Sequence, residues 1–390
     1  MRRFIIVVMD SVGCGELPDA AAYNSVGAHT LGHIASYRPL HLPNMQRLGL
    51  GNIVELSHVP PVDEPEGAWC KMAERTAGMD TTSGHWEIAG LVLDRPLPTY
   101  PDGFPTEVTD RLKEAFGCDI LGNCVASGTQ IIKDLGEEHM RTGKPIVYTS
   151  ADSVLQIACH EQVYSPEQLY ELCRKAREIM QGPHGVGRII ARPFLGSCAA
   201  DFWRTENRHD FSLQPPAGGL LQRVKEAGLP VVSIGKINDI FAGCDITDVL
   251  PGHDNAQSQE SLYKALDSFD RGLIFANFVD FDMVYGHRNN VEGYAAALEA
   301  FDAGLPAALD KLGPEDVLAV TADHGNDPTT MGTDHNREYV PLLLVGPRVR
   351  PVSLGVRASF ADLGQTAAEY LGAAPLPAGE SFLKDILQEV

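Results

Sequence analysis

The sequence predicts an α/β protein whose core is a mostly parallel sheet flanked by helices, with a smaller α+β domain inserted in the middle of the chain. Two observations predict this class. Short apolar runs without alternation recur between segments of helical period, which is typical of strands buried on both faces of a parallel sheet. Prolines gather on both sides of a middle region that has strand and helix patterns of its own.

The expected strands of the core are short and rich in valine, isoleucine and leucine. They cover residues 3–9, 230–235, 272–279, 317–321 and 339–345. The segments between them repeat apolar residues at helical spacing, as Phe301, Leu305 and Leu309 do. The expected helices cover residues 219–227, 258–270, 291–312 and 359–371. Strands that alternate with helices in this way predict helices packed over a mostly parallel sheet.

The middle of the chain is expected to form a separate domain. Prolines mark its borders, at positions 96, 98, 101 and 105 on one side and at positions 215 and 216 on the other. Between them lie two strand candidates and one helix that begins after a serine; they cover residues 145–148, 187–191 and 166–180. We therefore expect a core formed by residues 1–96 and 217–390, and an inserted α+β domain of residues 97–216.

Charge and composition argue against several classes of protein. The 390 residues carry a net charge of −21, and nucleic acids and anionic membranes repel a polyanion. An anionic small molecule remains compatible if metal ions or a few arginines reverse the local charge. The apolar run that ends at Asp10 is too short for a secretory signal, and no run approaches the ~20 apolar residues of a membrane-spanning helix. The eight cysteines lack Cys-x-x-Cys spacing, so we expect reduced thiols in a cytoplasmic protein.

Three of the apolar runs are followed by aspartates. Asp10, Asp282 and Asp323 each come after a different expected strand. Ligands of open parallel sheets bind beyond the carboxyl ends of the strands, so these carboxylates are expected to converge on one crevice. For a single aspartate, capping of the next helix is an equally good interpretation. Three such aspartates with histidines nearby favour a functional site.

Three histidines accompany these aspartates. His287 lies five residues after Asp282, His324 directly follows Asp323, and His335 lies eleven residues beyond His324. Mixed nitrogen and oxygen ligands suit zinc or manganese, whereas all-oxygen ligands suit magnesium or calcium. Six ligands favour two ions rather than one, and two ions can clamp the attacking and leaving oxygens of a phosphoryl transfer.

A run of adjacent hydroxyls supplies a candidate nucleophile. Thr81, Thr82 and Ser83 follow Asp80. A hydroxyl is a weak nucleophile until a metal lowers its pKa or a base removes its proton. The alternative interpretation is a polar turn or the start of a helix, and the residues themselves leave open which of the three hydroxyls would react.

Taken together, these residues resemble the alkaline phosphatase superfamily and, within it, the phosphopentomutase family. The resemblance runs over essentially the whole chain, and its motifs occur in the family's order. They are VVMDSVG at 7–13, DTTSGHWEIAG at 80–90, VYTSADSVLQI at 147–157, NRHD at 207–210, SIGKI at 233–237, VDFD at 279–282 and TADHGND at 321–327. One departure is Met79, where the family commonly has a lysine.

The resemblance implies roles for individual residues. Thr81 would be the nucleophile and would carry the phosphoryl group. Two manganese(II) ions are implied, one held by Asp282, His287 and His335, and the other held by Asp10, Asp323 and His324. The inserted domain resembles the family's cap, and Ser150, Asp152 and Val154 match the loop that holds the sugar. The basic groups around the distal phosphate are matched by Arg188, Arg204 and Lys236.

The implied reaction interconverts ribose 1-phosphate, or 2-deoxyribose 1-phosphate, and the 5-phosphate. It would pass through a phosphothreonine enzyme and a 1,5-bisphosphate, and a sugar bisphosphate such as glucose 1,6-bisphosphate or ribose 1,5-bisphosphate would prime it. A cap that closes over the site would keep water from the phosphoenzyme. The implied partners are small sugar phosphates of nucleoside salvage and pentose phosphate metabolism, with no nucleic acid and no membrane. No oligomeric state is predicted.

Three alternatives remain. The chain could be a hydrolase of the superfamily, although a sulfatase would need a modifiable cysteine or serine where this chain has Thr81. It could be a cofactor-independent phosphoglycerate mutase, although that family uses a serine and has a longer chain. A non-catalytic metal-binding protein is disfavoured because every proposed ligand and the nucleophile are present.

Overall fold

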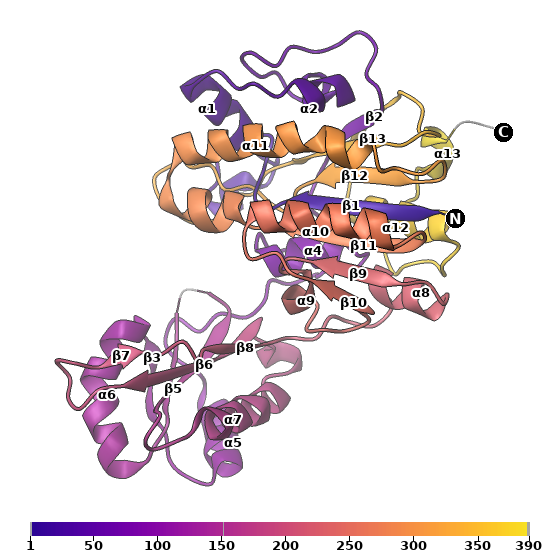
Figure 1. Cartoon of the computed structure of the whole chain (residues 1–390). Helices are drawn as coiled ribbons and strands as arrows, with labels where there is room; N and C mark the ends of the chain where they lie inside the picture. Colours follow the sequence, from indigo (N-terminus) through magenta and orange to yellow (C-terminus); the bar gives the residue numbers. More distant parts are fainter. Residues whose placement is uncertain (1, 151, 388–390) are drawn as a thin grey trace. The chain divides into compact units, whose positions relative to one another are not determined.

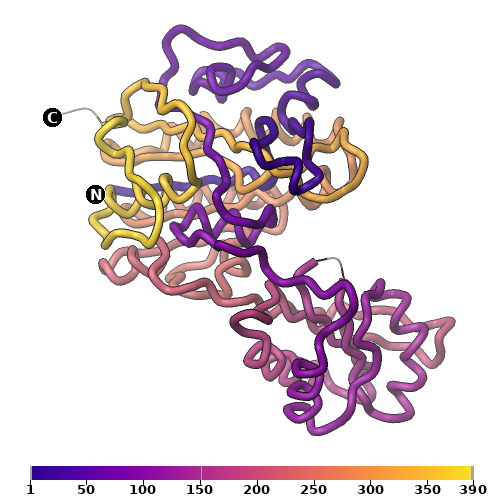
Figure 2. Tube along the Cα trace, turned by 180° about the vertical axis from the view of Figure 1, so that it is seen from behind, coloured from indigo at the N-terminus to yellow at the C-terminus, as the bar shows by residue number. Residues whose placement is uncertain are grey.

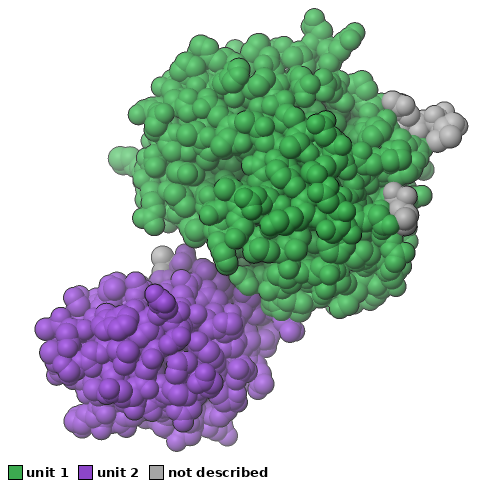
Figure 3. Space-filling view, in the orientation of Figure 1, with its two compact units in different colours: residues 1–95, 215–390 green, residues 96–214 purple. Residues whose placement is uncertain are grey.

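A computed structural model describes residues 2–150 and 152–387 of the chain. The chain divides into two compact units, which are coloured separately in Figure 3. The core unit comprises Met1–Arg95 and Pro215–Val390, and the inserted unit comprises Pro96–Gln214. Each unit has its own sheet.

The core unit is built on a sheet of eight described strands in the order β10-β9-β11-β1-β12-β13-β2-β14 (Figure 1). These strands are β1 (Arg3–Met9), β2 (Ala68–Met72), β9 (Val231–Ile234), β10 (Asp248–Leu250), β11 (Gly272–Phe278), β12 (Val317–Thr321), β13 (Val340–Val345) and β14 (Ser353–Arg357). Only β13 among them runs against the others, because it pairs antiparallel with both β12 and β2. The α/β class with a mostly parallel sheet is therefore confirmed.

The continuous apolar runs locate the central strands well. The runs at 3–9 and 317–321 coincide with β1 and β12, and those at 230–235, 272–279 and 339–345 extend at most one residue beyond β9, β11 and β13. Strand β13 is buried over most of its length although it is antiparallel. A continuous apolar run thus reports burial on both faces of the sheet and says nothing of strand direction.

Helices cover the sheet in two layers (Figure 1). One layer contains α1 (Thr30–Tyr37), α2 (Pro43–Leu48), α10 (Asn255–Ser268) and α11 (Val291–Leu309). The other contains α4 (Thr81–Ile88), α8 (Leu220–Glu226), α9 (Ile237–Ile240) and α12 (Ala361–Leu371). Short elements complete the unit: α3 (Leu50–Ile53), α13 (Leu383–Ile386), η1 (Ala20–Tyr23), η3 (Phe281–Tyr285) and η4 (Gly286–Arg288).

The helix ends differ from expectation where local contacts decide them. Helix α10 starts three residues before the expected position 258, because the carboxylate of Asp254 accepts a hydrogen bond from the backbone of Gln257 and caps the helix there. Helix α11 ends at Leu309 rather than at 312, and it contains Pro306 in its last turn. Among the described helices, none combines the length and the apolar character that crossing a bilayer requires.

The inserted unit has a six-stranded sheet of the described residues, ordered β3-β4-β5-β6-β7 with β8 also paired to β6. Its strands are β3 (Leu121–Val125), β4 (Ile146–Thr149), β5 (Val154–His160), β6 (Arg188–Leu195), β7 (Trp203–Arg204) and β8 (His209–Ser212). Helices α5 (Thr106–Phe116) and α7 (Pro166–Ile179), with η2 (Gly182–His184) after α7, and helix α6 (Gly128–Thr142) complete it. Two apolar clusters hold them to the sheet, one beneath α5 and α7 and the other beneath α6.

The fold places the six metal-ligand candidates beyond the carboxyl ends of the central strands of the core sheet. Strand β1 lies between β11 and β12, and all three run parallel. Figure 1 shows the indigo β1 between these two strands, and Figure 2 shows the course of the same chain from behind. Their carboxyl ends are therefore neighbours. The three segments that carry the aspartates and histidines begin at this edge.

Candidate metal centre and nucleophile

The three aspartates reach the crevice through short turns. Asp10 follows β1 directly, Asp323 lies two residues beyond β12, and Asp282 lies in the short helix η3 that follows β11. Ser11 has a φ of 73°, and its backbone N–H donates a 3.1 Å hydrogen bond to Asp323 Oδ1. Neither Asp10 nor Asp323 caps a described helix, so helix capping does not account for them.

Asp10, Asp323 and His324 form a fully buried group. Their ligand atoms all lie within 4.8 Å of one another. His324 Nε2 is 3.3 Å from Asp10 Oδ1 and 3.4 Å from Asp323 Oδ2. Each side chain is 0 % exposed. One imidazole thus faces two carboxylates in a space from which water is excluded.

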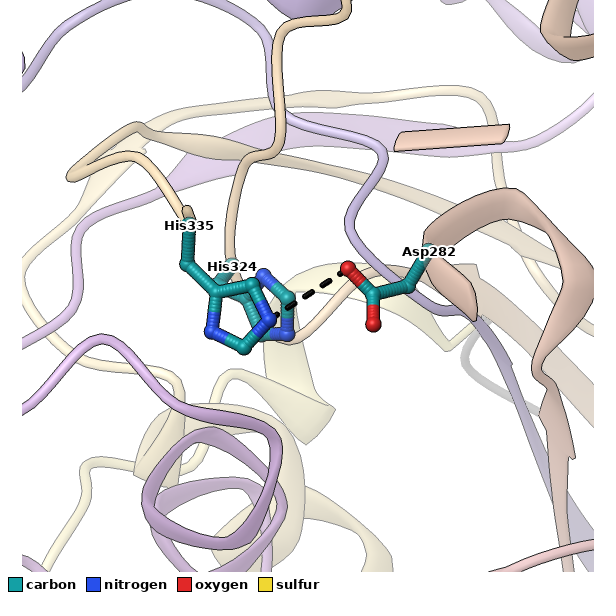
Figure 4. A group of neighbouring side chains, drawn as sticks. All are labelled: Asp282, His324 and His335. Atoms are coloured by element: carbon teal, nitrogen blue, oxygen red, sulfur yellow. Dashed lines mark ion pairs between the residues drawn. The ribbon is translucent and has the colours of Figure 1, made fainter. Parts of the chain in front are cut away.

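Asp282, His324 and His335 form a second, more open group (Figure 4). His335 Nε2 lies 3.3 Å from Asp282 Oδ1, and its ring lies beside that of His324, tilted by 31° with the centroids 4.0 Å apart. His287 Nε2 lies beside this group, 3.1 Å from Asp282 Oδ2 and 3.2 Å from His335 Nε2. The two groups therefore share His324, which places the six ligand candidates in one continuous cluster.

The carboxylates and imidazoles of this cluster shift one another's pKa. Burial alone would raise the pKa of Asp282, but hydrogen bonds from His287 and His335 hold it well below its usual range. Burial also opposes the shift at Asp323, whose pKa is lowered by His324 and His85. The pKa of His324 is raised well above its ordinary value because the carboxylates of Asp323 and Asp10 outweigh its burial. The cluster therefore favours positive charge at its centre.

The donor atoms fit a pair of divalent cations. Asp10 Oδ1 and Asp323 Oδ2 are buried and accept no hydrogen bond from any described residue, which is costly for a carboxylate oxygen without a partner. Both oxygens face His324 Nε2. A metal ion bound at a neutral imidazole would replace the proton that these carboxylates otherwise attract. Mixed nitrogen and oxygen donors are the set that suits manganese or zinc.

The candidate nucleophile is the first residue of helix α4. Asp80 caps this helix by accepting a hydrogen bond from the backbone of Ser83, whose hydroxyl contacts Asp80 in return. The run of hydroxyls is thus a helix start, as the alternative interpretation held. The side chain of Thr81 nevertheless points at the cluster of ligand candidates, because its Oγ1 lies 3.2 Å from His324 Nε2. Within the described part of the chain, no hydrogen bond joins the side chain of Thr82 or Ser83 to the six ligand candidates, and the Ser83 hydroxyl contacts Asp80 instead.

The loop before Thr81 is held by buried contacts. Arg337 donates hydrogen bonds to the carbonyls of Glu74, Thr76 and Gly78 and forms an ion pair with Glu74. The backbone carbonyl of Met79, the residue at which this chain departs from the family's common lysine, lies 3.0 Å from His335 Nδ1. The loop is therefore tied directly to a ligand candidate.

The sugar-binding candidates of the inserted unit lie around the starts of two paired strands. Ser150 follows β4, and the carbonyl of Asp152 accepts a hydrogen bond from the backbone of Val154, the first residue of β5. Val154 stands opposite Arg188, the first residue of β6. These four residues thus form one neighbourhood.

Arg204 lies elsewhere on the same sheet. It stands opposite Phe194, near the far end of β6 from Arg188. There it lines a hollow of about 250 Å³ together with Arg192, Pro193, Thr205 and Arg208. Burial, and then the charge of Arg208, lower the pKa of Arg192. Because these positive charges lie close together, the binding of an anion in the hollow would reduce their repulsion.

Lys236 belongs to the core unit. It lies two residues after β9, the strand next to β11, and precedes helix α9. It is partly buried. Burial raises the pKa of Asp280 above its ordinary value, and the charge of Lys236 is one of the smaller effects that oppose this rise. The carboxyl edge of the core sheet thus also carries a cation.

Sequence reasoning missed several polar groups that support the site. Asn326 donates a 2.8 Å hydrogen bond to Asp282 Oδ1, and Asn277 donates one of 2.8 Å to Asp10 Oδ2. Arg192 and Arg208 line the hollow with Arg204. Asn326 and Arg208 both lie inside the quoted motifs, so their position was a usable signal. Asn277 lies inside an apolar strand, and the only sign of its role in the sequence was an amide among apolar residues.

Comparison with known proteins extends these observations. A family model described as the metalloenzyme superfamily matches residues 2–375. A phosphopentomutase of Symbiobacterium thermophilum is 55% identical over 389 residues, which cover 99% of each chain. A phosphopentomutase of Desulfitobacterium hafniense is also 55% identical, and the match covers 99% of this chain and 100% of the relative.

Among solved structures, a phosphoglycerate mutase of Leishmania mexicana matches with a TM-score of 0.49 at 16% identity. The match covers 99% of this chain and 98% of that one.

Proposed function

The chain belongs to the phosphopentomutase family of the metalloenzyme superfamily and is a mutase; on this premise we propose that it interconverts the 1-phosphates and 5-phosphates of ribose and 2-deoxyribose. The observation that carries the mechanism is the contact of Thr81 Oγ1 with His324 Nε2, 3.2 Å apart, at the rim of a buried cluster of carboxylates and imidazoles. A hydroxyl in such a place can accept and return a phosphoryl group.

The six ligand candidates would hold two divalent ions, which we assign as manganese(II). Asp282, His287 and His335 would supply one set of donors, and Asp10, Asp323 and His324 the other. Bound there, the ions would neutralise charge on the transferring phosphoryl group and stabilise the deprotonated form of Thr81. The support for this assignment is the pair of buried, unpartnered carboxylate oxygens on Asp10 and Asp323.

Thr81 would act as the phosphate carrier. In the resting enzyme it would be phosphothreonine, formed from a sugar bisphosphate primer such as glucose 1,6-bisphosphate or ribose 1,5-bisphosphate. It would give its phosphoryl group to the free hydroxyl of the sugar phosphate and form a 1,5-bisphosphate. It would then take back the phosphoryl group from the other end. The cap of helix α4 holds Thr81 in place for both transfers.

The inserted unit would bind the sugar phosphate and act as a cap that excludes water. Ser150, Asp152 and Val154 would contact the sugar, and Arg188 and Arg204 would pair with the phosphate that does not react, as would Lys236 of the core unit. Although Arg188 and Arg204 stand at opposite ends of β6, the side chain of Arg188 contacts Asp210, which also binds Arg208 of the hollow beside Arg204. The arginine-lined hollow beside Arg204 supports an anion site in this unit. Water exclusion matters because a phosphothreonine open to water would make the protein a phosphatase.

We place this activity in the cytoplasm, in the salvage of nucleosides and the metabolism of pentose phosphates. The free thiols of all eight cysteines and the polyanionic surface fit that placement. The partners would be small sugar phosphates, with no nucleic acid and no membrane.

The test is product analysis of the purified protein with manganese(II), ribose 5-phosphate and a catalytic amount of glucose 1,6-bisphosphate. We expect ribose 1-phosphate to form without release of inorganic phosphate. Release of inorganic phosphate without ribose 1-phosphate would instead identify a hydrolase. A parallel assay with 2-deoxyribose 5-phosphate compares kcat/KM for the two sugars.

A further inference from the structure

Two buried side chains that the proposed reaction does not use connect the metal cluster to the nucleophile. Asn277 lies near the end of β11, and His85 lies one helical turn after Thr81 in α4. Both are 0 % exposed. A polar side chain buried this completely is expected to have a specific set of hydrogen-bond partners.

The amide of Asn277 joins two of these groups. Its Nδ2 donates a 2.8 Å hydrogen bond to Asp10 Oδ2 and lies 3.3 Å from His85 Nε2. An amide nitrogen has two N–H donors and no acceptor, so this arrangement uses both of them. It also makes His85 Nε2 the acceptor of the pair.

The tautomer of His85 follows from this contact. If Nε2 accepts from Asn277, a neutral imidazole carries its proton on Nδ1. Nδ1 lies 2.8 Å from the carbonyl oxygen of Thr81, and its single proton is donated to that carbonyl, since Asp323 Oδ2 accepts no hydrogen bond from any described residue although it lies 3.0 Å from the same nitrogen. Donor and acceptor roles therefore alternate from Asp10 through Asn277 Nδ2 and His85 to Thr81, whereas Asn277 Oδ1 takes no part in this network and accepts no hydrogen bond from the described residues.

We propose that Asn277 and His85 are positioning residues: together they form an uncharged hydrogen-bonded chain that holds the Asp10 carboxylate in register with the backbone of Thr81. The inference rests on the proposed metal-binding role of Asp10 and Asp323. Partners that orient a metal ligand typically change metal affinity or activity by about 10- to 100-fold when they are removed.

The chemistry of the site explains why an amide occupies position 277. A carboxylate there would add another negative charge beside Asp10 and Asp323, both of which are buried. An apolar residue would leave Asp10 Oδ2 and His85 Nε2 without a donor. An amide is neutral and can donate to both.

The test is a calorimetric titration of manganese(II) into metal-free full-length protein, which measures metal affinity without any turnover. Asn277→Leu has a similar size and no donor, and we expect it to weaken one manganese-binding step about 10- to 100-fold. The matched control is Ser258→Ala, because the buried hydroxyl of Ser258 contacts only the backbone carbonyl of Asn277, at 3.2 Å, within this network. We expect the control to bind manganese within about twofold of the wild type.

Two substitutions of His85 distinguish its hydrogen bond with Asn277 from its hydrogen bond with the Thr81 carbonyl. In His85→Asn the amide lies near the former Nδ1 and can still donate to the Thr81 carbonyl, but the link to Asn277 is lost. In His85→Gln the longer amide reaches toward Asn277, but the donor to Thr81 is lost. We expect His85→Asn to weaken manganese binding as Asn277→Leu does. We expect His85→Gln to retain manganese affinity and to lower kcat.

The double variant Asn277→Leu/His85→Asn gives the decisive comparison. If the two residues form one chain, the double variant binds manganese no more weakly than the weaker-binding single variant. Additive losses, or affinities within twofold of the wild type in both single variants, would overturn the inference. If Asn277→Leu does not fold, His85→Asn alone against the wild type decides it. A wild type that converts no pentose phosphate but shows this pattern would refute the proposed function and leave the inference standing.

Discussion

The candidate sites of the two units carry opposite local charges. In the core unit, Asp10, Asp323 and His324 are fully buried, and negative charge dominates the crevice. In the inserted unit, Arg192, Arg204 and Arg208 line an open hollow, and positive charge dominates. The core site is suited to bind cations and the inserted site to bind an anion. A polyanionic chain can therefore bind a sugar phosphate because each unit sets its own local charge.

The two sites also differ in how their side chains are held. The core residues follow parallel strand ends and are fixed by buried hydrogen bonds such as that from Ser11 to Asp323. Arg192 is held by Gln156, and Arg208 by the two oxygens of Asp210, on the surface of a small sheet. We therefore expect substitutions in the core to change the chemical step, and substitutions in the inserted unit to change binding.

The largest expected effect is that of Thr81→Ala. Loss of the phosphate carrier should lower kcat by at least about 10³-fold, while the fold and the manganese content are retained. Mass spectrometry after incubation with glucose 1,6-bisphosphate should show one added phosphoryl group on the wild type and none on the variant.

Thr82→Ala is the matched control for Thr81→Ala, because its hydroxyl lies on the same helical turn without contact to His324. It should retain kcat within about threefold. If Thr82→Ala or Ser83→Ala were inactive while Thr81→Ala remained active, the assignment of the nucleophile would be wrong.

A second prediction concerns stability and pH in the core. Burial raises the pKa of Glu338 to about 7, above its ordinary value of 4.5. Between these values the folded protein binds more protons than the unfolded chain. The contribution of Glu338 to the free energy of unfolding should therefore fall as the pH rises from 4.5 to 7, by about 3 kcal/mol in total. In Glu338→Gln this contribution should vanish because an amide does not titrate, and the fold should be kept because the amide oxygen can still accept from the Gly15 and Thr30 backbones.

Urea titrations of the metal-free protein from pH 4.5 to 8 measure this effect, in a Trp203→Phe background that leaves the tryptophans of the core as reporters. Asp210→Asn provides the contrast from the inserted unit; it is followed through Trp203 of β7, without the Trp203→Phe substitution, in titrations extended below pH 4. Burial opposes the shift there, but hydrogen bonds from Arg208 lower the pKa of Asp210. Its stabilising effect is present above pH 4 and is lost as the pH falls. A parallel pH dependence of Glu338→Gln and the wild type would contradict the assignment at Glu338.

The smallest expected effect is that of Arg204→Gln in the inserted unit. Loss of one cation from the hollow should raise KM for ribose 5-phosphate about 10-fold and leave kcat within about threefold, because the chemical step is carried out in the core. Steady-state kinetics at saturating manganese separate the two constants. Arg141→Gln, which removes an exposed arginine near the end of α6, should change neither. A fall in kcat without a change in KM would contradict the division of labour between the units.

Much of the fold could be predicted because strong local signals mark it. The runs that became β1 and β12 are bounded by charged residues and buried along their whole length, and the capping box of Ser165 and Gln168 marks the start of α7. Strand β2 was not predicted, because its residues alternate between buried and half-buried positions over a short length. The direction of β13 was not predictable either, since direction depends on connections and not on composition.

The candidate site was also predictable only in part. Its six ligand candidates could be proposed from their positions after strands, and the structure brings them together. That His324 belongs to both groups depends on side-chain directions, which spacing alone does not specify. The separation of Arg188 from Arg204 along β6 could not be predicted either. It depends on the pairing of β7 and β8 with β6, which joins segments that are apart in the sequence.

The central position of β1 also determines the order in which the molecule can fold during its synthesis. This strand precedes every other described strand in the sequence, yet Arg3 pairs with Gly272 and Phe4 pairs with Val317. The strands of the inserted unit pair only with one another, so that sheet can be completed while β1 still lacks both neighbours. Strand β1 therefore lacks one or both neighbours until residues 272–278 and 317–321 have been synthesised, and the acidic centre cannot form until Asp323 and His324 have emerged.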